Sequence, residues 1–448
     1  MTSRFFGSIA YVALLMRCAT DACRADSDCP DGTCRNGVCQ APILATDIPD
    51  IPDIPDTPDI AMDVPEAVDL ADGQGLVQPP LEETGAEAEV TRPPADCRES
   101  ASTPLLRELV RDGVAVADGY AIGGVARTPT GGPAQGWLRA VDANGAVLFD
   151  LVAGGEGEDT LRGVAANDSS VAGVGNAEVS PGVYQGWLWV VGLDGQVRLN
   201  QHYGLPGEDW LAAIATLPDG GWLAVGSRPS QGRDAWLLTV DSDGNPIRND
   251  SHGGRLSEEF SDVATGPNGF VAVGSRVDPN NSATRMPLLA FFDSSGAFQT
   301  EKFFGDSSFE QRGLAITPTP AGFAIITETV AIPGVLWVDT TGNELRWEQF
   351  QRPNPSALNQ LTSLPDGDLV LFGEMLIGET QNDPWLLRVS PAGDVNLERR
   401  WEYPTHDYGR ALIQLGDQLI VAGDLAAPET DLWTQRLTLD GSDPDCGR

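Results

Sequence analysis

One unit recurs seven times in tandem from residue 97 to the C-terminus. Each copy contains an apolar run that ends in a V-D-x-x-G sequence or a variant, such as VDANG, VDSDG or FDSSG. The last residues of these sequences are Gly145, Gly195, Gly244, Gly296, Gly342, Gly393 and Gly441. Successive glycines lie 46 to 52 residues apart. A tandem repeat of this length predicts an array of equivalent structural units, not a set of unrelated domains.

Two further landmarks keep a fixed place within each copy. Eight residues before each of those glycines stand Trp137, Trp187, Trp236, Leu288, Gly334, Trp385 and Trp433. An earlier apolar run ends at Gly124, Gly173, Gly226, Gly274, Thr327, Gly373 and Gly423. Copy five, which has Gly334 instead of a tryptophan, carries Trp337 three residues later. We expect the tryptophans to pack between neighbouring units; stacking on a ligand is the alternative.

Each copy predicts four short strands, named a to d in chain order. In the third copy these are residues 211–217, 222–226, 236–241 and 245–250, with glycine-containing turns between them. Strands b and c are almost continuously apolar, so both faces of each sheet must be covered, and radially stacked sheets cover one another. The sequence therefore predicts an all-β fold, a seven-bladed β-propeller of four-stranded antiparallel blades. The unit resembles bacterial propeller repeats of the loose W-L-x-x-V-D-x-x-G type.

The two ends of the repeat region predict how the ring closes. Copy seven ends after its c strand, whereas residues 97–109 precede the a strand of copy one, so this N-terminal piece is expected to complete the last blade. Cys97 and Cys446 are the two cysteines of the repeat region, one at each end. We expect a disulfide between them. It would close a loop of about 350 residues and restrict the unfolded chain accordingly.

The N-terminus, residues 1–18, has the pattern of an export signal. Arg4 is followed by an apolar run from Phe5 to Met16, which is too short to span a membrane. Cys18 follows directly and resembles the lipidated cysteine of bacterial lipoproteins, although Arg17 departs from the small residue expected before it. The alternatives are cleavage after Ala22 and an uncleaved N-terminal anchor. The expected location is thus the outer membrane or cell surface as a lipoprotein, or secretion.

Residues 19–40 contain four cysteines, Cys23, Cys29, Cys34 and Cys39, with too few apolar residues for a core. Two disulfides are expected to hold this segment in an oxidising compartment, with the pairing left open. A zinc site is less well supported because no C-x-x-C pair or histidine is nearby. The segment, CRADSDCPDGTCRNGVC, resembles the small EB-type or Dickkopf-like cysteine module of myxobacterial surface proteins.

Residues 41–96 form a linker of very different composition. They contain 14 acidic residues against the single Arg92, and an Ile-Pro-Asp triplet repeats between Ile48 and Asp59. Frequent proline and like charges favour an extended, solvated chain without a core. Residues 97–448 form the propeller in this division of the chain.

Charge excludes one broad class of partner. The chain carries 28 basic and 65 acidic residues, a net charge of −37. Such a surface repels phosphate backbones and anionic lipids, so nucleic-acid binding is excluded and any membrane attachment is expected only through the N-terminal lipid. We expect a monomer.

A recurring acidic residue between strand d of one copy and strand a of the next marks a candidate ligand-facing rim. The residues selected at this position are Asp159, Asp209, Glu259 and Asp407. They could attract a cation or polar ligand to the mouth of the central channel. The alternative is that each carboxylate accepts N–H bonds from its own loop. The loops between strands b and c, such as GNAEVSPGVYQG, vary between copies, as binding loops do.

No catalytic constellation is apparent. The three histidines are His202, His252 and His406, and His252 takes a position held by aromatic residues in neighbouring copies. No recognised nucleotide, metalloprotease or hydrolase motif is present, and the DSDGN sequence at Asp241 lacks the last ligand of a calcium loop. No cofactor or metal is expected.

Two functions are compatible with these sequence features. The first is a noncatalytic cell-surface or secreted protein that binds an extracellular protein or polysaccharide through the loop-bearing face. The second is a secreted polysaccharide hydrolase or lyase, which needs two free carboxylates in one cleft.

Overall fold

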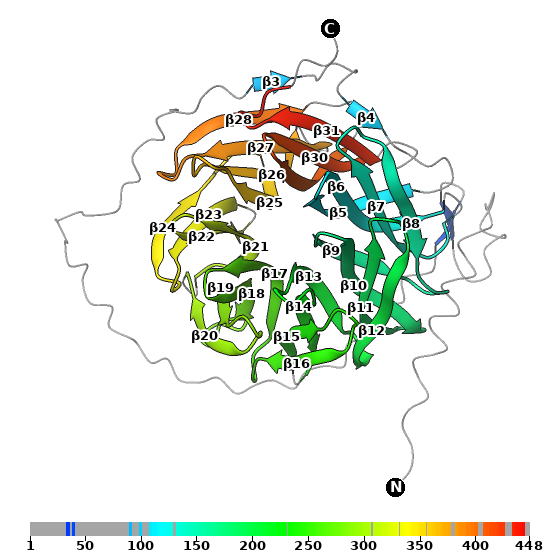
Figure 1. The fold of residues 1–448 in the computed structure, drawn as a ribbon. Coiled ribbons are helices and arrows are strands. Elements are labelled where there is room, and N and C mark those ends of the chain that lie inside the picture. The colour runs from blue at the N-terminus through cyan, green and yellow to red at the C-terminus, as the bar shows by residue number, and fades with distance from the viewer. Residues whose placement is uncertain are drawn as a thin grey trace, which may run out of the picture. The chain divides into compact units, whose positions relative to one another are not determined.

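Seven antiparallel sheets surround a central axis and form a closed β-propeller (Figure 1). The computed structural model describes residues 33–35, 38–40, 89–91, 98–100 and 107–443, except 129–130, 231, 306–307, 331, 355, 378–380, 402–405 and 426–431. Every regular element within these residues is a strand. The predicted all-β fold of seven four-stranded antiparallel blades is confirmed.

The first four blades each use four consecutive strands. Blade 1 comprises β5 (Arg107–Val116), β6 (Gly119–Arg127), β7 (Gln135–Asp142) and β8 (Val147–Ala153). Blade 2 comprises β9 (Thr160–Ala166), β10 (Ser170–Ser180), β11 (Val183–Gly192) and β12 (Val197–Gly207). Blade 3 comprises β13 (Trp210–Thr216), β14 (Trp222–Pro229), β15 (Arg233–Val240) and β16 (Pro246–His252). Blade 4 comprises β17 (Glu258–Gly266), β18 (Gly269–Val277), β19 (Arg285–Phe292) and β20 (Phe298–Phe303).

The last three blades complete the ring, and two of them recruit strands from upstream of the repeats. Blade 5 comprises β21 (Gln311–Thr319), β22 (Gly322–Thr329), β23 (Ile332–Asp339) and β24 (Glu344–Gln349). Blade 6 comprises β25 (Ser356–Ser363), β26 (Leu369–Ile377), β27 (Gln381–Val389), β28 (Val395–Trp401) and β3 (Glu89–Thr91). Blade 7 comprises β29 (Asp407–Leu415), β30 (Gln418–Leu425), β31 (Leu432–Thr438) and β4 (Arg98–Ser100).

Ring closure follows the predicted route. Strand β4 pairs antiparallel with β31, with Ser100 opposite Trp433 and Arg98 opposite Gln435. The N-terminal piece therefore supplies the missing fourth strand of blade 7 (Figure 1). Cys97 and Cys446 lie outside the described residues, so their disulfide stays a prediction.

Strand β3 is a feature that the sequence pattern did not predict. It lies within the segment predicted as linker, and it pairs in parallel with the outer strand β28 of blade 6. Glu89 is opposite Arg399 and Thr91 is opposite Trp401. The outer edge of this blade is thus covered by a short strand, which removes an exposed ladder edge.

The N-terminal unit, Met1–Pro80, is separate from the propeller unit, Leu81–Arg448. Its described part is a hairpin of β1 (Thr33–Arg35) and β2 (Val38–Gln40), in which Cys34 is directly opposite Cys39. Cys18, Cys23 and Cys29 lie outside the described residues. The lipidation and the two predicted disulfides of the module therefore stay predictions.

The repeated tryptophan and glycine are cross-strand partners. Gly226 on β14 is opposite Trp236 on β15, and the same pairing recurs in four other blades. A Cβ on Gly226 would overlap the carbonyl oxygen of Trp210 on the neighbouring strand, so only glycine fits there. The Trp236 indole N–H donates to Asn249 Oδ1 on the outer strand at 2.9 Å. Each landmark therefore serves packing within its blade.

The tryptophans also join neighbouring blades, as predicted. Trp187 of blade 2 packs over Gly136 of blade 1, where a Cβ would overlap the indole ring. In blade 2 the tryptophan's partner is Gly175, so the choice of Gly173 as landmark was two residues early. Blade 5, without this tryptophan, pairs Thr327 with Gly334 instead.

The hairpin turns between strands c and d are built by aspartate and glycine. Asp241 Oδ1 accepts the N–H groups of Asp243 at 2.9 Å and Asn245 at 2.8 Å, and Gly244 has φ of 83°. Those hydrogen bonds, together with one from the Asn245 side chain, lower the pKa of the Asp241 carboxyl. The DSDGN sequence is thus a turn whose carboxylate is already engaged.

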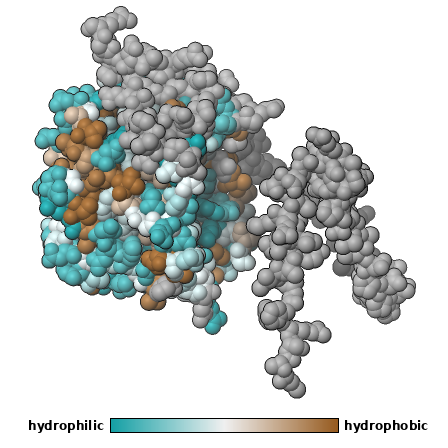
Figure 2. Space-filling model, turned by 90° about the vertical axis from the view of Figure 1, so that its right-hand side faces the viewer, coloured by the Kyte–Doolittle hydropathy of each residue, from teal (hydrophilic) through white to brown (hydrophobic). Residues whose placement is uncertain are grey.

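The outer strands of the blades form the circumference of the ring. Val147 and Val197 are the first residues of two of these strands, Ile247 is the second residue of a third, and all three are 54 to 55% exposed. In the side view of Figure 2, hydrophobic groups alternate with hydrophilic surface. In the described part of the chain, no helix is both long and apolar enough to cross a membrane.

Candidate functional site

Two sets of loops meet on one face of the propeller. The Asp159 N–H, in the loop from strand d to strand a, donates to the Ala134 carbonyl of the b–c loop at 2.8 Å. An Arg127–Glu158 ion pair of 2.7 Å joins the same two segments. The loop-bearing face predicted from the sequence is therefore formed by d–a and b–c loops together.

A buried polar residue recurs just below this face. In each blade, one residue of strand a pairs with the landmark residue at the end of the apolar run in strand b. The buried polar residue lies two positions before that strand-a residue. The seven residues are Glu108, Asp159, Asp209, Glu258, Gln311, Ser356 and Asp407. None is more than 8% exposed. A position that stays polar and buried in all seven blades has a structural role in the loops above it.

Asp159 and Asp209 show what this position does. Asp159 accepts the N–H of Glu178 at 2.9 Å and also that of Gly155, while Asp209 accepts the Leu205 N–H at 2.7 Å. Burial raises the pKa of both carboxyls, and these hydrogen bonds oppose the rise. With Asp407 fully buried, three of the four rim residues selected from the sequence lie beneath the surface.

Glu259, the fourth rim residue, lies elsewhere. The buried position in blade 4 belongs to Glu258, and Glu259 is its neighbour on the opposite side of the strand. Glu259 accepts hydrogen bonds from Ser275 Oγ at 3.1 Å and from Arg285 at 3.2 Å. It also lines a pocket at the channel mouth. The two adjacent glutamates of this copy thus have different roles, which the sequence pattern did not separate.

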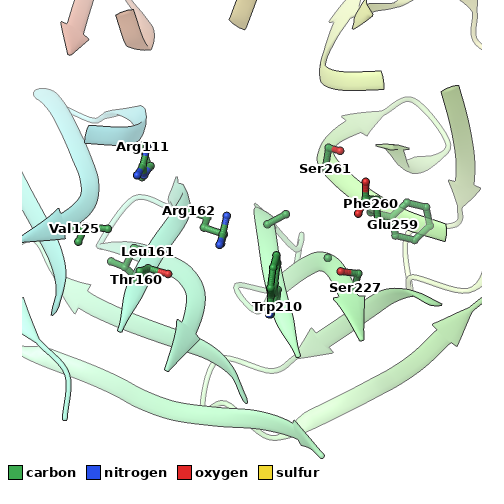
Figure 3. A pocket seen from close by; sticks show the side chains of 12 residues that line it. Arg111, Val125, Thr160, Leu161, Arg162, Trp210, Ser227, Glu259, Phe260 and Ser261 are labelled. Carbon is green, nitrogen blue, oxygen red and sulfur yellow. The ribbon is translucent and has the colours of Figure 1, made fainter. Parts of the chain in front are cut away.

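The pocket has a volume of about 540 Å³ and is built by four consecutive blades, 1 to 4. Its lining residues are Arg111, Val125, Thr160, Leu161, Arg162, Trp210, Ala212, Gly226, Ser227, Glu259, Phe260 and Ser261. Figure 3 shows Arg111 and Arg162 on one side, Glu259 and Ser261 on the other, and Trp210 between them. The size is within the usual range for small-ligand sites.

A β-bulge in every inner strand determines which side chains enter the channel. Where strand a pairs with strand b, one residue of strand a is left out of the ladder in each blade. These bulge residues are Arg111, Arg162, Ala212, Ser261, Leu314, Asn359 and Arg410. The first four line the pocket. A bulge redirects a side chain in this way because it interrupts the strict alternation of the strand.

The sequence pattern did not single out Arg111, Arg162 or Trp210. The signal available was a cation within an otherwise apolar strand a, as in TLRGVAA of blade 2. Trp210 is 36% exposed. The guanidinium groups of Arg162 and Arg233 lie 5.0 and 4.6 Å from its ring centroid, so cation–π contacts hold all three side chains in place.

Two aspartates, each directly after a bulge residue, join inner strands of adjacent blades. Asp112 accepts the Val164 N–H at 2.8 Å, and Asp262 accepts the Ile316 N–H at 2.8 Å. Enclosure by protein raises the pKa of Asp112 to about 6 and that of Asp262 to about 7. Both carboxylates are therefore used for blade-to-blade contacts.

His252 and His406 take part in hydrogen bonding and side-chain packing. His252 Nε2 lies 2.9 Å from Glu301 Oε2, and its ring packs 4.2 Å from that of Phe298. His406 accepts the Asn382 N–H at 3.3 Å. Within the described residues, no cluster of three histidine, cysteine, aspartate or glutamate side chains could hold a metal ion.

One predicted loop is largely strand. The GNAEVSPGVYQG segment of blade 2 continues strands β10 and β11 up to a tight turn at Gly182, which has φ of 74°. Glu178 accepts the N–H of Gly182 within this hairpin and the N–H of Glu158 in the preceding d–a loop. The segment is therefore part of the sheet of blade 2, one of the four blades that form the pocket.

Comparisons with known proteins do not assign the chain to a family. No family model matches it, and no curated protein matches it. Among solved structures, the WD40 domain of Pan2 from Neurospora crassa matches with a TM-score of 0.44 and 10% identity, over 77% of this chain and 96% of that one. Sqt1 from Chaetomium thermophilum matches with a TM-score of 0.44 and 13% identity, over 75% and 83%. The described blades and lining residues themselves define a seven-bladed propeller with a ligand-sized pocket at its loop-bearing face.

Proposed function

We propose that this protein is a noncatalytic binding protein that recognises an extracellular ligand with the loop-bearing face of its propeller. The propeller fold suits such a role, because a rigid ring presents loops from several blades to one ligand. The observation that carries the proposal is the pocket formed by residues of blades 1 to 4.

The catalytic alternative has less support. A glycosidase needs two carboxyl groups about 5 to 10 Å apart on either side of the scissile bond. Among the described residues that line the pocket, Glu259 is the single carboxylate, and it is engaged by Arg285 and Ser275. Asp159 and Asp209 accept backbone N–H groups beneath the surface. A binding role therefore fits this face better than hydrolysis.

The extracellular setting belongs to the same proposal. It is supported by the export-signal pattern of residues 1–18, by the cysteine-rich segment after it and by the acidic linker. In this proposal Cys18 carries the lipid, and the linker separates the propeller from the membrane. Palmitate labelling that is lost in Cys18→Ser would support the anchor, whereas equal labelling of both chains would contradict it.

Blocking the pocket tests the binding role. Ser261→Trp places a large side chain in the pocket, and Ser294→Trp places one in an exposed c–d turn of the same blade, at its other end. Both chains are screened with wild type against extracellular polysaccharides and proteins. We expect a ligand that binds wild type and Ser294→Trp but not Ser261→Trp. Equal binding by all three chains would overturn the assignment of this face, and release of shortened saccharides by wild type would favour the enzyme.

A further inference from the structure

Two arginines from adjacent blades enter the pocket without a counter-charge of their own. Arg111 is the bulge residue of β5 and Arg162 is that of β9 (Figure 3). Neither forms an ion pair with any residue in the described ranges. Arg162 donates from Nε to Asn176 Oδ1 at 3.4 Å and packs on Trp210, which leaves the rest of its guanidinium facing the pocket.

Both arginines are exposed to the pocket, and the protein around them still disfavours their positive charge in part. Partial desolvation lowers the pKa of both guanidinium groups, and the charge of Arg111 lowers that of Arg162 further. Asp424 and Glu374 attract Arg111, but less strongly than desolvation acts on it. Because arginine stays protonated in proteins, the pair is stabilised by a bound anion rather than by losing a proton.

The net charge of the chain limits what that anion can be. With −37 overall, the protein repels a polyanion such as a nucleic acid over a long range. A single carboxylate on an otherwise neutral body suffers much less repulsion and still makes paired hydrogen bonds with guanidinium groups. The local pair can therefore select one negative group within a generally repulsive field.

The rest of the pocket is suited to a polyhydroxylated body. Side-chain hydroxyls of Ser227 and Ser261 and the carboxylate of Glu259 lie on the far side from the arginines, and carboxylates accept only. Trp210, between the two sides, offers apolar surface. Hydrogen-bond acceptors and hydroxyls around an aromatic ring match the hydroxyl groups and apolar faces of a sugar.

From these contacts we infer that the pocket binds an acidic saccharide of the uronic acid type, with its carboxylate held between Arg111 and Arg162 and its hydroxyl groups facing Glu259 and Ser261. This rests on the proposed binding function and names the ligand class for the same pocket. Trp210 acts as a positioning residue for Arg162 through their cation–π contact.

The test compares two ligands with the same sugar rings, one with free carboxylates and one with methyl-esterified carboxyl groups. Full-length protein is titrated calorimetrically with a trigalacturonate and with its fully methyl-esterified form. Because the ester removes the carboxylate charges and keeps the sugar rings, we expect about tenfold or more weaker binding of the ester. High salt should weaken binding of the acid and leave that of the ester unchanged.

Variants then assign the effect to the arginines. Arg162→Gln should weaken binding of the acid about tenfold or more, to an affinity close to that of the ester. Arg248→Gln is the charge-matched control, since Arg248 pairs with Asp250 on an outer strand, and it should bind like wild type. Ser261→Trp should abolish binding of both ligands.

The outcomes separate the two proposals. If acid and ester bind equally and Ser261→Trp blocks both, the anion inference is wrong and the binding function stands. If neither saccharide binds, or an acetylated acidic hexapeptide binds more tightly with the same dependence on Arg162, the saccharide inference is wrong. If Ser261→Trp leaves binding of the acid intact, the ligand uses another face and both proposals fail.

Discussion

Two sides of the channel mouth use the same bulge position in opposite ways. In blades 1 and 2, Arg111 and Arg162 face the pocket without an ion pair among the described residues. In blade 7, Arg410 pairs with Glu374 of blade 6 at 3.2 Å and with Asp424 at 3.5 Å. The paired arginine lies next to the point of ring closure, and Arg111 of the neighbouring blade 1 is attracted by the same Asp424 and Glu374 without forming an ion pair.

Asp424 also accepts the Val110 N–H of blade 1 at 2.6 Å, so it connects the last blade to the first. Asp424 thus joins two blades that are distant in sequence, whereas the Arg410–Glu374 pair joins blades 6 and 7, which are consecutive. Arg111 and Arg162 form no ion pair among the described residues and are left available to a ligand.

The largest expected effect is on the ring closure itself. If Cys97 and Cys446 form the predicted disulfide, Cys97→Ser should lower the free energy of unfolding by about 4 kcal/mol, because the unfolded chain gains freedom. Denaturant unfolding of the variant measures this. Cys34→Ser is the control, since Cys34 lies in the separate N-terminal unit. Alkylation of both Cys97 and Cys446 without prior reduction would disprove the bond.

The paired and unpaired arginines should differ in their effect on stability. Arg410→Gln leaves the carboxylates of Glu374 and Asp424 without their cation, so we expect a loss of about 2 to 3 kcal/mol. Arg162→Gln removes no ion pair and should stay within about 0.5 kcal/mol of wild type. Denaturant midpoints of the two variants give the comparison. Equal losses would show that both arginines are structural.

The channel aspartates predict a pH dependence on the pocket side. The pKa of Asp112 rises from 3.8 to about 6 and that of Asp262 to about 7, so the folded state holds protons that the unfolded chain releases. Stability should therefore fall as pH rises from about 4 to about 7, by on the order of a few kcal/mol. Unfolding curves across this range measure the slope. Asp262→Asn should flatten it, and an unchanged slope would contradict the assignment.

The smallest expected effect on stability comes from the cation–π contact between Arg233 and Trp210. Arg233→Gln removes one of its two cation–π contacts and should cost about 0.5 kcal/mol of stability. A double-mutant cycle with Trp210→Phe isolates the interaction. A coupling energy of zero would mean that Arg233 serves Glu208 and Ser227 instead, with which it also forms hydrogen bonds.

Most of the fold was accessible from the sequence because its signals are local and repeated seven times. Turn glycines such as Gly244 and tryptophans such as Trp236 make their contacts within one blade. Most copies repeat the same turn and the same cross-strand pair. The residues of the pocket were harder to predict from the sequence. Glu258 and Glu259 are adjacent, and only the register of β17 shows that the first is buried and the second lines the pocket.

The sequence by itself determined the number of blades, the strands in each and the use of an N-terminal strand to complete the last one, since hydrophobic periodicity and turn residues carry that information. Only the tertiary structure decided that Arg111 and Arg162 meet in one pocket while Arg410 is paired. The physical reason is the bulge, which places one extra residue in each inner strand and interrupts its two-residue alternation, so the direction of that side chain depends on pairing with a neighbouring strand.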